Sequence, residues 1–136
     1  MSTVREIELL EASPEVRRVF EDIMATKGIG FVPNFWRALA SHPPLLEQVW
    51  SSLKRTMAPG RLDPLTKEMI ALAVSATNGC SYCVHSHTAS ARKLGMDDEM
   101  LGEVMAVAGL FNQTNALAEA DQVEVDPEIF AVSSGS

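Results

Sequence analysis

Residues 63–95, DPLTKEMIALAVSATNGCSYCVHSHTASARKLG, predict two helices joined by a tight turn. The aspartate that precedes Pro64 is typical of a helix start, because its side chain caps free backbone N–H groups and proline suits the first helical position. Asn78 and Gly79 are typical turn residues. The apolar run at 69–74 would also suit a buried strand, but its alanines, its length and its capped start favour a helix. The segment therefore predicts an antiparallel helical hairpin.

The rest of the chain also shows apolar residues at helical spacing. Further helices are expected over residues 14–27, 34–39 and 45–57, and from 97 or 98 through at least 111. These segments predict an all-α bundle of about six helices. We expect a single domain over residues 1–136, with a core at about 13–120 and an acidic, partly frayed tail at 121–136.

The composition limits the partners that this chain can have. Its formal net charge is −7, with 46% hydrophobic and 21% charged residues, and this argues against binding to nucleic acid or anionic lipid. No apolar run is long enough to span a bilayer, and the first residues do not resemble a secretory signal. We therefore expect a cytoplasmic protein without membrane partners. In a reducing compartment, a close cysteine pair tends to be catalytic, redox-sensing or metal-binding.

Cys80 and Cys83 are the chain's two cysteines, and they lie at the expected start of the second helix. With about 100° per residue, Cys83 lies at about 300° from Cys80 and His87 at about 340°, whereas His85 lies at about 140° on the far side. The spacing thus selects His87 as the companion of the thiols. A helix start presents unpaired N–H groups and the positive end of the dipole, so a thiolate is stabilised there.

Glu68 is expected to face the same site from the first helix. If the hairpin closes at the Asn-Gly turn, Glu68 lies opposite His87 and within about two turns of Cys83. It shares a stripe with Leu65 and Leu72, where a carboxylate is costly unless it has a partner. A partnered carboxylate at this position suits a general base. The interpretation depends on the hairpin, because a continuous helix would separate Glu68 from the cysteines.

The spacing of four residues resembles a known family motif. The pattern is E-x11-C-x2-C-x3-H, formed by Glu68, Cys80, Cys83 and His87. It is similar to the motif of the alkyl hydroperoxidase D (AhpD) group, within the carboxymuconolactone decarboxylase-like superfamily. The segment at about 62–111 resembles the core domain of that group, and residues 31–35, FVPNF, resemble a segment of its small members.

The resemblance implies an all-helical fold, a homo-oligomer (usually a trimer or a hexamer) and a thiol peroxidase that needs no cofactor. It implies that Cys83 attacks a small hydroperoxide, that Cys80 resolves the product to a disulfide, and that Glu68 and His87 relay protons. A thioredoxin-like or lipoyl-type dithiol would then restore the pair. The chain departs from the best-studied type at Tyr82, where that type has a histidine before the second cysteine.

Three other functions stay open at this point. Cys80, Cys83 and His87, with Glu68 or a water, would suit a tetrahedral zinc site. A non-enzymatic redox sensor would form the disulfide without turnover. A decarboxylase of the superfamily is a minor alternative, because those enzymes lack the dithiol.

Overall fold

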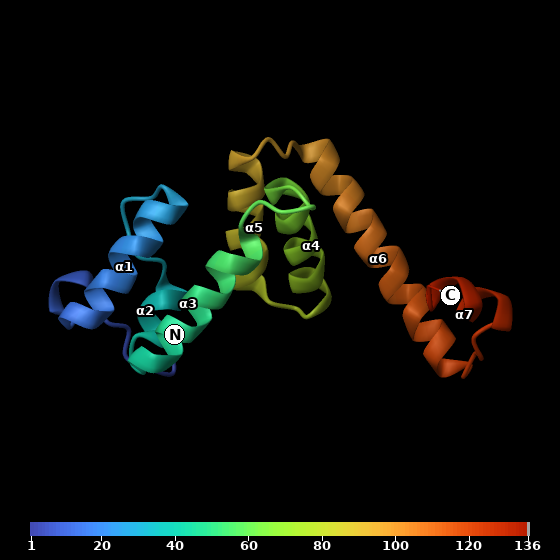
Figure 1. Ribbon diagram of the computed structural model, residues 1–136, viewed down its shortest axis with the longest axis horizontal. Helices are drawn as coiled ribbons and strands as arrows, with labels where there is room; N and C mark the ends of the chain where they lie inside the picture. Colours follow the sequence, from blue (N-terminus) through green and yellow to red (C-terminus); the bar gives the residue numbers. More distant parts are fainter. Residues whose placement is uncertain (136) are drawn as a thin grey trace. The chain divides into compact units, whose positions relative to one another are not determined.

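Helices make up most of the described part of the chain. The computed structural model describes residues 1–135 and contains no strand among them (Figure 1). The all-α prediction is therefore confirmed. Contacts between residues divide the chain into two units, Met1–Ala58 and Pro59–Ser136. The single domain over residues 1–136 stays a prediction.

The first unit holds three α-helices and a short 3-10 helix. These are η1 (Leu9–Glu11), α1 (Pro14–Lys27), α2 (Asn34–Leu39) and α3 (Pro43–Met57). The predicted start of α1 is confirmed, since the Ser13 hydroxyl accepts a hydrogen bond from the Val16 N–H at 3.3 Å and Pro14 follows it. The buried core consists of Ala12, Val16, Phe20, Ile23, Val32, Trp36, Ala40, Leu46 and Trp50.

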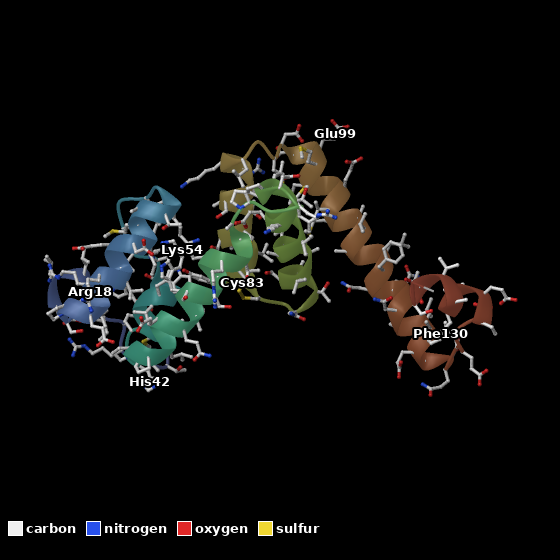
Figure 2. The ribbon with its side chains drawn as sticks, in the orientation of Figure 1. Arg18, His42, Lys54, Cys83, Glu99 and Phe130 are labelled. Atoms are coloured by element: carbon white, nitrogen blue, oxygen red, sulfur yellow. A yellow bond between two sulfur atoms is a disulfide. The ribbon has the colours of Figure 1, made fainter. Side chains whose placement is uncertain are left out.

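An aromatic pair and an acidic side chain join the helices of this unit. The rings of Trp36 and Trp50 pack edge to face with centroids 5.2 Å apart. The Trp50 Nε1–H donates to Asp22 at 2.8 Å, and Lys54, labelled in Figure 2, donates to both oxygens of the same carboxylate. These hydrogen bonds, first from Lys54 and then from Trp50, hold the pKa of Asp22 below its ordinary value. Asp22 therefore ties α1 to α3.

The second unit contains α4 (Pro64–Thr77), α5 (Ser81–Lys93), α6 (Asp98–Ala120) and α7 (Pro127–Ser133). Asp63 caps α4 as predicted, because its carboxylate accepts a hydrogen bond from the Thr66 N–H at 2.9 Å. Leu72, Ala91 and Met96 form the buried core of this unit. Partly buried side chains around it are Leu65, Met69, Val84, Met100, Leu101, Val104 and Met105. Helix α4 thus packs between its neighbours α5 and α6.

The structure adds two elements that the sequence did not predict. The described residues form seven α-helices where about six were expected, and both η1 and α7 are new. Helix α7 lies inside the segment 121–136 that was expected to be a partly frayed tail, whose last residue, Ser136, falls outside the described residues. None of the helices within residues 1–135 combines the length and the apolar character needed to cross a membrane.

Candidate dithiol site

The turn between α4 and α5 places the cysteines. Gly79 has a φ of +69°, in the left-handed region that glycine adopts without steric cost. The N–H of Gly79 bonds to the Ala76 carbonyl, and the N–H of Cys80 bonds to the Ser75 carbonyl at 3.0 Å. These bonds satisfy the last carbonyls of α4 and reverse the chain. The predicted antiparallel hairpin, with the CxxC at the start of its second helix, is confirmed.

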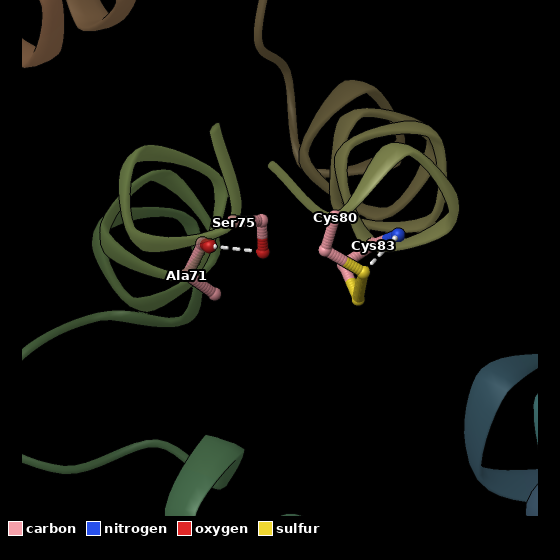
Figure 3. Close-up of a disulfide and its surroundings, with 4 residues drawn as sticks. All are labelled: Ala71, Ser75, Cys80 and Cys83. Carbon is pink, nitrogen blue, oxygen red and sulfur yellow. Dashed lines mark hydrogen bonds between the residues drawn. A yellow bond between two sulfur atoms is a disulfide. The ribbon is translucent and has the colours of Figure 1, made fainter. Parts of the chain in front are cut away.

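Cys80 is the N-cap residue of α5. Its sulfur accepts a hydrogen bond from the Cys83 N–H at 3.2 Å, in the role that a serine or aspartate oxygen fills at other helix starts. The two cysteines form a disulfide with their Cα atoms 5.2 Å apart (Figure 3). Both residues are only partly buried. The pair is therefore within bonding range, lies at the positive end of a helix and stays open to a reactant.

Glu68 and His87 come together beside the same hairpin. The Nδ1 atom of His87 lies 2.8 Å from Oε2 of Glu68, and the two side chains are 24% and 13% exposed. Glu68 extends from α4, whereas His87 lies on α5 one turn after Cys83. The predicted meeting of these two residues is confirmed. The carboxylate can hold the imidazole in one orientation and stabilise it when it gains a proton.

Ser75 is a residue of the site that the sequence analysis missed. Its side chain is 8% exposed, and its hydroxyl donates to the Ala71 carbonyl at 2.7 Å. Figure 3 shows this hydroxyl on the side of α4 that faces the disulfide. The backbone carbonyl of the same residue holds the Cys80 N–H, so Ser75 supports the first cysteine. Its signal in the sequence was a polar residue three positions after Leu72, on the buried stripe of α4.

Two side chains near the cysteines lie at the surface. His85 is exposed, in agreement with its predicted position away from the thiols, and Tyr82 is 44% exposed. No group of three or more His, Cys, Asp or Glu residues within 1–135 is arranged to hold a metal ion. The structure thus joins Cys80 to Cys83 and Glu68 to His87, and His87 follows Cys83 by one turn of α5.

Comparison with known proteins places this chain in a family. The model of the carboxymuconolactone decarboxylase family matches residues 43–123, which include the whole hairpin. The chain belongs to this family. A solved structure, the alkylhydroperoxidase AhpD core from Rhodospirillum rubrum, is 51% identical, with a TM-score of 0.90 over 96% of this chain and 98% of that one. The resemblance of this family member to AhpD proteins is confirmed.

Curated relatives match a shorter stretch. The alkyl hydroperoxide reductase AhpD of Streptomyces griseus is 39% identical over 56 residues, which are 41% of this chain and 32% of that protein. An uncharacterised protein of the cox locus of Paracoccus denitrificans is 35% identical over 69 residues, 51% of this chain and 62% of that protein. The matches therefore span less than two thirds of either relative.

Proposed function

We propose that this chain is a dithiol peroxidase that reduces small alkyl hydroperoxides. The observation that carries the proposal is the Glu68–His87 pair, one turn from a cysteine pair at the start of α5. A base near a thiol and the positive end of a helix both favour the thiolate, which is the reactive form. The names of the AhpD relatives support the same class of reaction.

The reaction starts from the reduced pair. His87, oriented by Glu68, accepts the proton of Cys83 through a water molecule. The Cys83 thiolate attacks the terminal oxygen of the hydroperoxide, so that an S–O bond forms and the O–O bond breaks. The alcohol leaves with a proton, and Cys83 becomes a sulfenic acid. Cys80 then attacks this sulfur as a thiolate, water leaves, and the disulfide forms.

The hydrogen bond to Cys80 supports different roles for the two sulfurs in re-reduction. Because the Cys83 N–H donates to the Cys80 sulfur, negative charge is better stabilised on Cys80. An external thiolate therefore attacks the sulfur of Cys83, and Cys80 leaves as the thiolate. A second thiol of the donor then attacks the mixed disulfide and releases Cys83. The donor becomes a disulfide, and its two electrons restore the dithiol.

The partners follow from the same chemistry. The donor must carry two thiols that reach a partly exposed disulfide, and a thioredoxin-like protein or a lipoyl-type dithiol meets this need. The cytoplasm, expected from the sequence, keeps such donors reduced. We also propose a homo-oligomer, a trimer or a hexamer, as the resemblance implies. Tyr82 has no imidazole, so in this proposal the proton relay consists of Glu68 and His87.

Peroxide consumption with dithiothreitol as donor tests the proposal. We expect turnover in the wild type and its loss in Cys83→Ser. In Cys80→Ser a single turnover should leave a sulfenic acid on Cys83, detected by mass spectrometry after trapping with dimedone. If Cys80 is trapped in Cys83→Ser instead, the two roles are reversed. A wild type that forms the disulfide without consuming peroxide would contradict the proposed enzyme and indicate a redox sensor.

The zinc alternative is tested in the same protein. The wild type is purified without chelator, its metal content is measured, and its thiols are counted. We expect two titratable thiols after reduction and no stoichiometric metal. One zinc ion per chain, whose removal makes the two thiols accessible to alkylation, would contradict the proposed peroxidase.

A further inference from the structure

Ser75 on α4 differs from the other buried residues because it is polar. It is 8% exposed, and the other residues buried to this extent within 1–135 are apolar. Its hydroxyl donates a hydrogen bond to the Ala71 carbonyl at 2.7 Å. This bond compensates the burial of the hydroxyl hydrogen, but both partners belong to α4. The hydroxyl bond therefore does not hold α4 against another helix.

Alanine would suit the fold at this position at least as well as serine. Alanine has the highest helix propensity, and serine lies well below it. A serine that bonds to the carbonyl four positions earlier slightly destabilises its helix and often bends it. The helix thus gains nothing from the hydroxyl of Ser75, so its surroundings decide what the hydroxyl can do.

The hydroxyl lies on the side of α4 that faces α5. At about 100° per residue, Ser75 lies within about 20° of Glu68, whose carboxylate reaches His87 on α5 at 2.8 Å. The backbone carbonyl of Ser75 accepts the Cys80 N–H at 3.0 Å. Figure 3 shows the hydroxyl between α4 and the disulfide. Ser75 thus contacts the first cysteine through its backbone and presents its hydroxyl to the cysteine pair.

A hydroxyl hydrogen can change its acceptor while the oxygen stays in place, because it rotates about the Cβ–Oγ bond. Sulfur without charge is a weak acceptor, so the hydroxyl donates to the Ala71 carbonyl while the cysteines form a disulfide. A thiolate is a much stronger acceptor, because it carries a full negative charge. The Ala71 carbonyl also accepts the N–H of Ser75 through the regular spacing of the helix, so rotation leaves it bonded.

Of the two sulfurs, Cys80 is the one that gains from this donor. The Cys83 N–H already donates to the Cys80 sulfur at 3.2 Å, so negative charge is favoured there. The Ser75 carbonyl holds the backbone of the same cysteine. In the proposed reaction Cys83 gives its proton to His87, so the two sulfurs depend on different partners.

We propose that the Ser75 hydroxyl is a hydrogen-bond donor to the Cys80 thiolate and turns to it from the Ala71 carbonyl when the disulfide is reduced. In that step an external thiolate bonds to the Cys83 sulfur, the S–S bond breaks, and its electron pair stays on Cys80. The hydroxyl keeps its proton throughout. The effect on turnover rests on the proposed function, whereas the state of the Cys80 thiol is measured without peroxide.

Alkylation by iodoacetamide tests the proposal in Cys83→Ala, where Cys80 is the one cysteine left. The rate follows the thiolate fraction, so its pH profile has a midpoint. We expect Ser75→Ala to raise this midpoint by about one pH unit, the size of a typical hydrogen bond to a charged group. Ser75→Thr keeps a hydroxyl and should keep the midpoint. Ser90→Ala, which removes a hydroxyl about 15 Å further along α5, is the matched control and should also keep it.

The comparison isolates the hydroxyl because every variant keeps the charged surroundings of the pair. On α4 and the first two turns of α5, the other titratable groups are Lys67, Glu68, Tyr82, His85 and His87. The α6 side chains that pack on the core of this unit are apolar. An unchanged midpoint in Ser75→Ala, or an equal rise in Ser75→Thr or Ser90→Ala, would overturn the proposal.

Thermal unfolding shows whether the hydroxyl belongs to the fold instead. We expect Ser75→Ala to unfold, by circular dichroism, at the wild-type temperature or above, because alanine is the better helix former. A midpoint temperature lower by more than about 5 °C would mean a loss of roughly 1 kcal/mol, and it would assign the hydroxyl to the fold and overturn the proposal.

Rates of single steps connect Ser75 to turnover. Reduction of the disulfide by dithiothreitol, followed in acid-quenched samples by mass spectrometry, should be about 3-fold to 10-fold slower in Ser75→Ala, because Cys80 becomes a poorer leaving group. Formation of the Cys83 sulfenic acid, measured in Cys80→Ser, should be the same with and without Ser75→Ala. Equal slowing of both steps would overturn the assignment to Cys80. If the wild type consumes no peroxide but the Cys80 midpoint rises in Ser75→Ala, the proposed peroxidase fails and the role of Ser75 stands.

Discussion

Replacing Glu68 by glutamine removes one negative charge from the dithiol site and keeps the shape of the side chain. In the proposed reaction His87 carries a proton, and hence a positive charge, while the Cys83 thiolate attacks. Oε2 of Glu68 lies 2.8 Å from Nδ1 of His87, so the carboxylate stabilises that charge directly. The amide of glutamine can still hydrogen-bond to the imidazole. The variant therefore isolates the electrostatic contribution of Glu68 from its packing.

The size of the effect follows from the distance and the burial. Two unit charges this far apart attract by about 1.5 kcal/mol at the dielectric constant of water and by about 6 kcal/mol at an effective value of about 20. Because the side chains of His87 and Glu68 are 24% and 13% exposed, an intermediate value applies. About 3 kcal/mol corresponds to a loss of roughly 100-fold in rate.

The assay is the initial rate of peroxide consumption at saturating dithiothreitol, with Glu103→Gln as the control. Glu103 is an exposed residue of α6, and its replacement removes the same charge elsewhere in the same unit. We expect Glu103→Gln to keep the wild-type rate. If Glu68→Gln stays within threefold of that rate while the thiol count is unchanged, the acid–imidazole pair takes no part in the reaction.

Three further predictions concern stability. Lys54 and Trp50 lower the pKa of Asp22, so the ionised Asp22 stabilises the folded protein. This contribution to the free energy of unfolding is complete above the unfolded pKa of about 3.9, and it is lost as the pH falls through the lower folded pKa. Because the side chain of Asp22 is 43% exposed, the contribution is about 0.5 kcal/mol. In urea unfolding followed by tryptophan fluorescence, Asp22→Asn should have a lower midpoint concentration than the wild type at pH 7. The difference between the two midpoints should be smaller at pH 2.5, and a difference that does not change with pH would contradict the prediction. Leu72→Ala leaves a cavity at a fully buried position and should lower the free energy of unfolding, followed by circular dichroism, by about 2 to 5 kcal/mol. Leu94→Ala, at a position that is 46% exposed, should lower it far less. Equal losses in the two variants would contradict the place of Leu72 in the core. Gly79→Ala must adopt a positive φ and should cost about 1 kcal/mol, whereas Gly102→Ala, inside α6 with open space around it, should stabilise by a similar amount; a neutral Gly79→Ala would mean that the turn is not strained.

The sequence predicted the Glu68–His87 contact and the position of the cysteines at a helix start because the signals for both are local. Glu68 and His87 are 19 positions apart, and they come into contact once Asn78 and Gly79 form the turn between the two helices. Asparagine and glycine are each strong signals of a turn. The spacing of Cys80 and Cys83 places both at the first turn of α5 by helix geometry alone. The catalytic roles of these residues stay a prediction, because geometry does not measure reactivity.

The features that the sequence missed depend on weaker or more distant interactions. Helix α7 has only seven residues, although Asp126 before Pro127 repeats the start signal of α4. Arg37 holds the segment before α1 in place through two contacts. Its side chain forms an ion pair with Glu8, and its backbone carbonyl accepts a hydrogen bond from the Ile7 N–H. Contacts between residues so far apart leave no periodic pattern. Ser75 was missed although it is a polar residue on the buried stripe of α4, because its bond to Cys80 comes from its backbone carbonyl, which every residue has.

The cap at the start of α5 explains how the pair can change its redox state while the helix keeps its start. The Cys83 N–H donates to the Cys80 sulfur, and a thiolate accepts such a bond more strongly than a disulfide sulfur does. The Cys80 N–H stays bonded to the Ser75 carbonyl independently of the sulfur. Reduction therefore breaks the covalent link but keeps both bonds that fix the first turn. Since neither bond involves His87, the proposed mechanism needs no rearrangement of the His87–Glu68 contact, 2.8 Å in the disulfide form, when the pair is reduced.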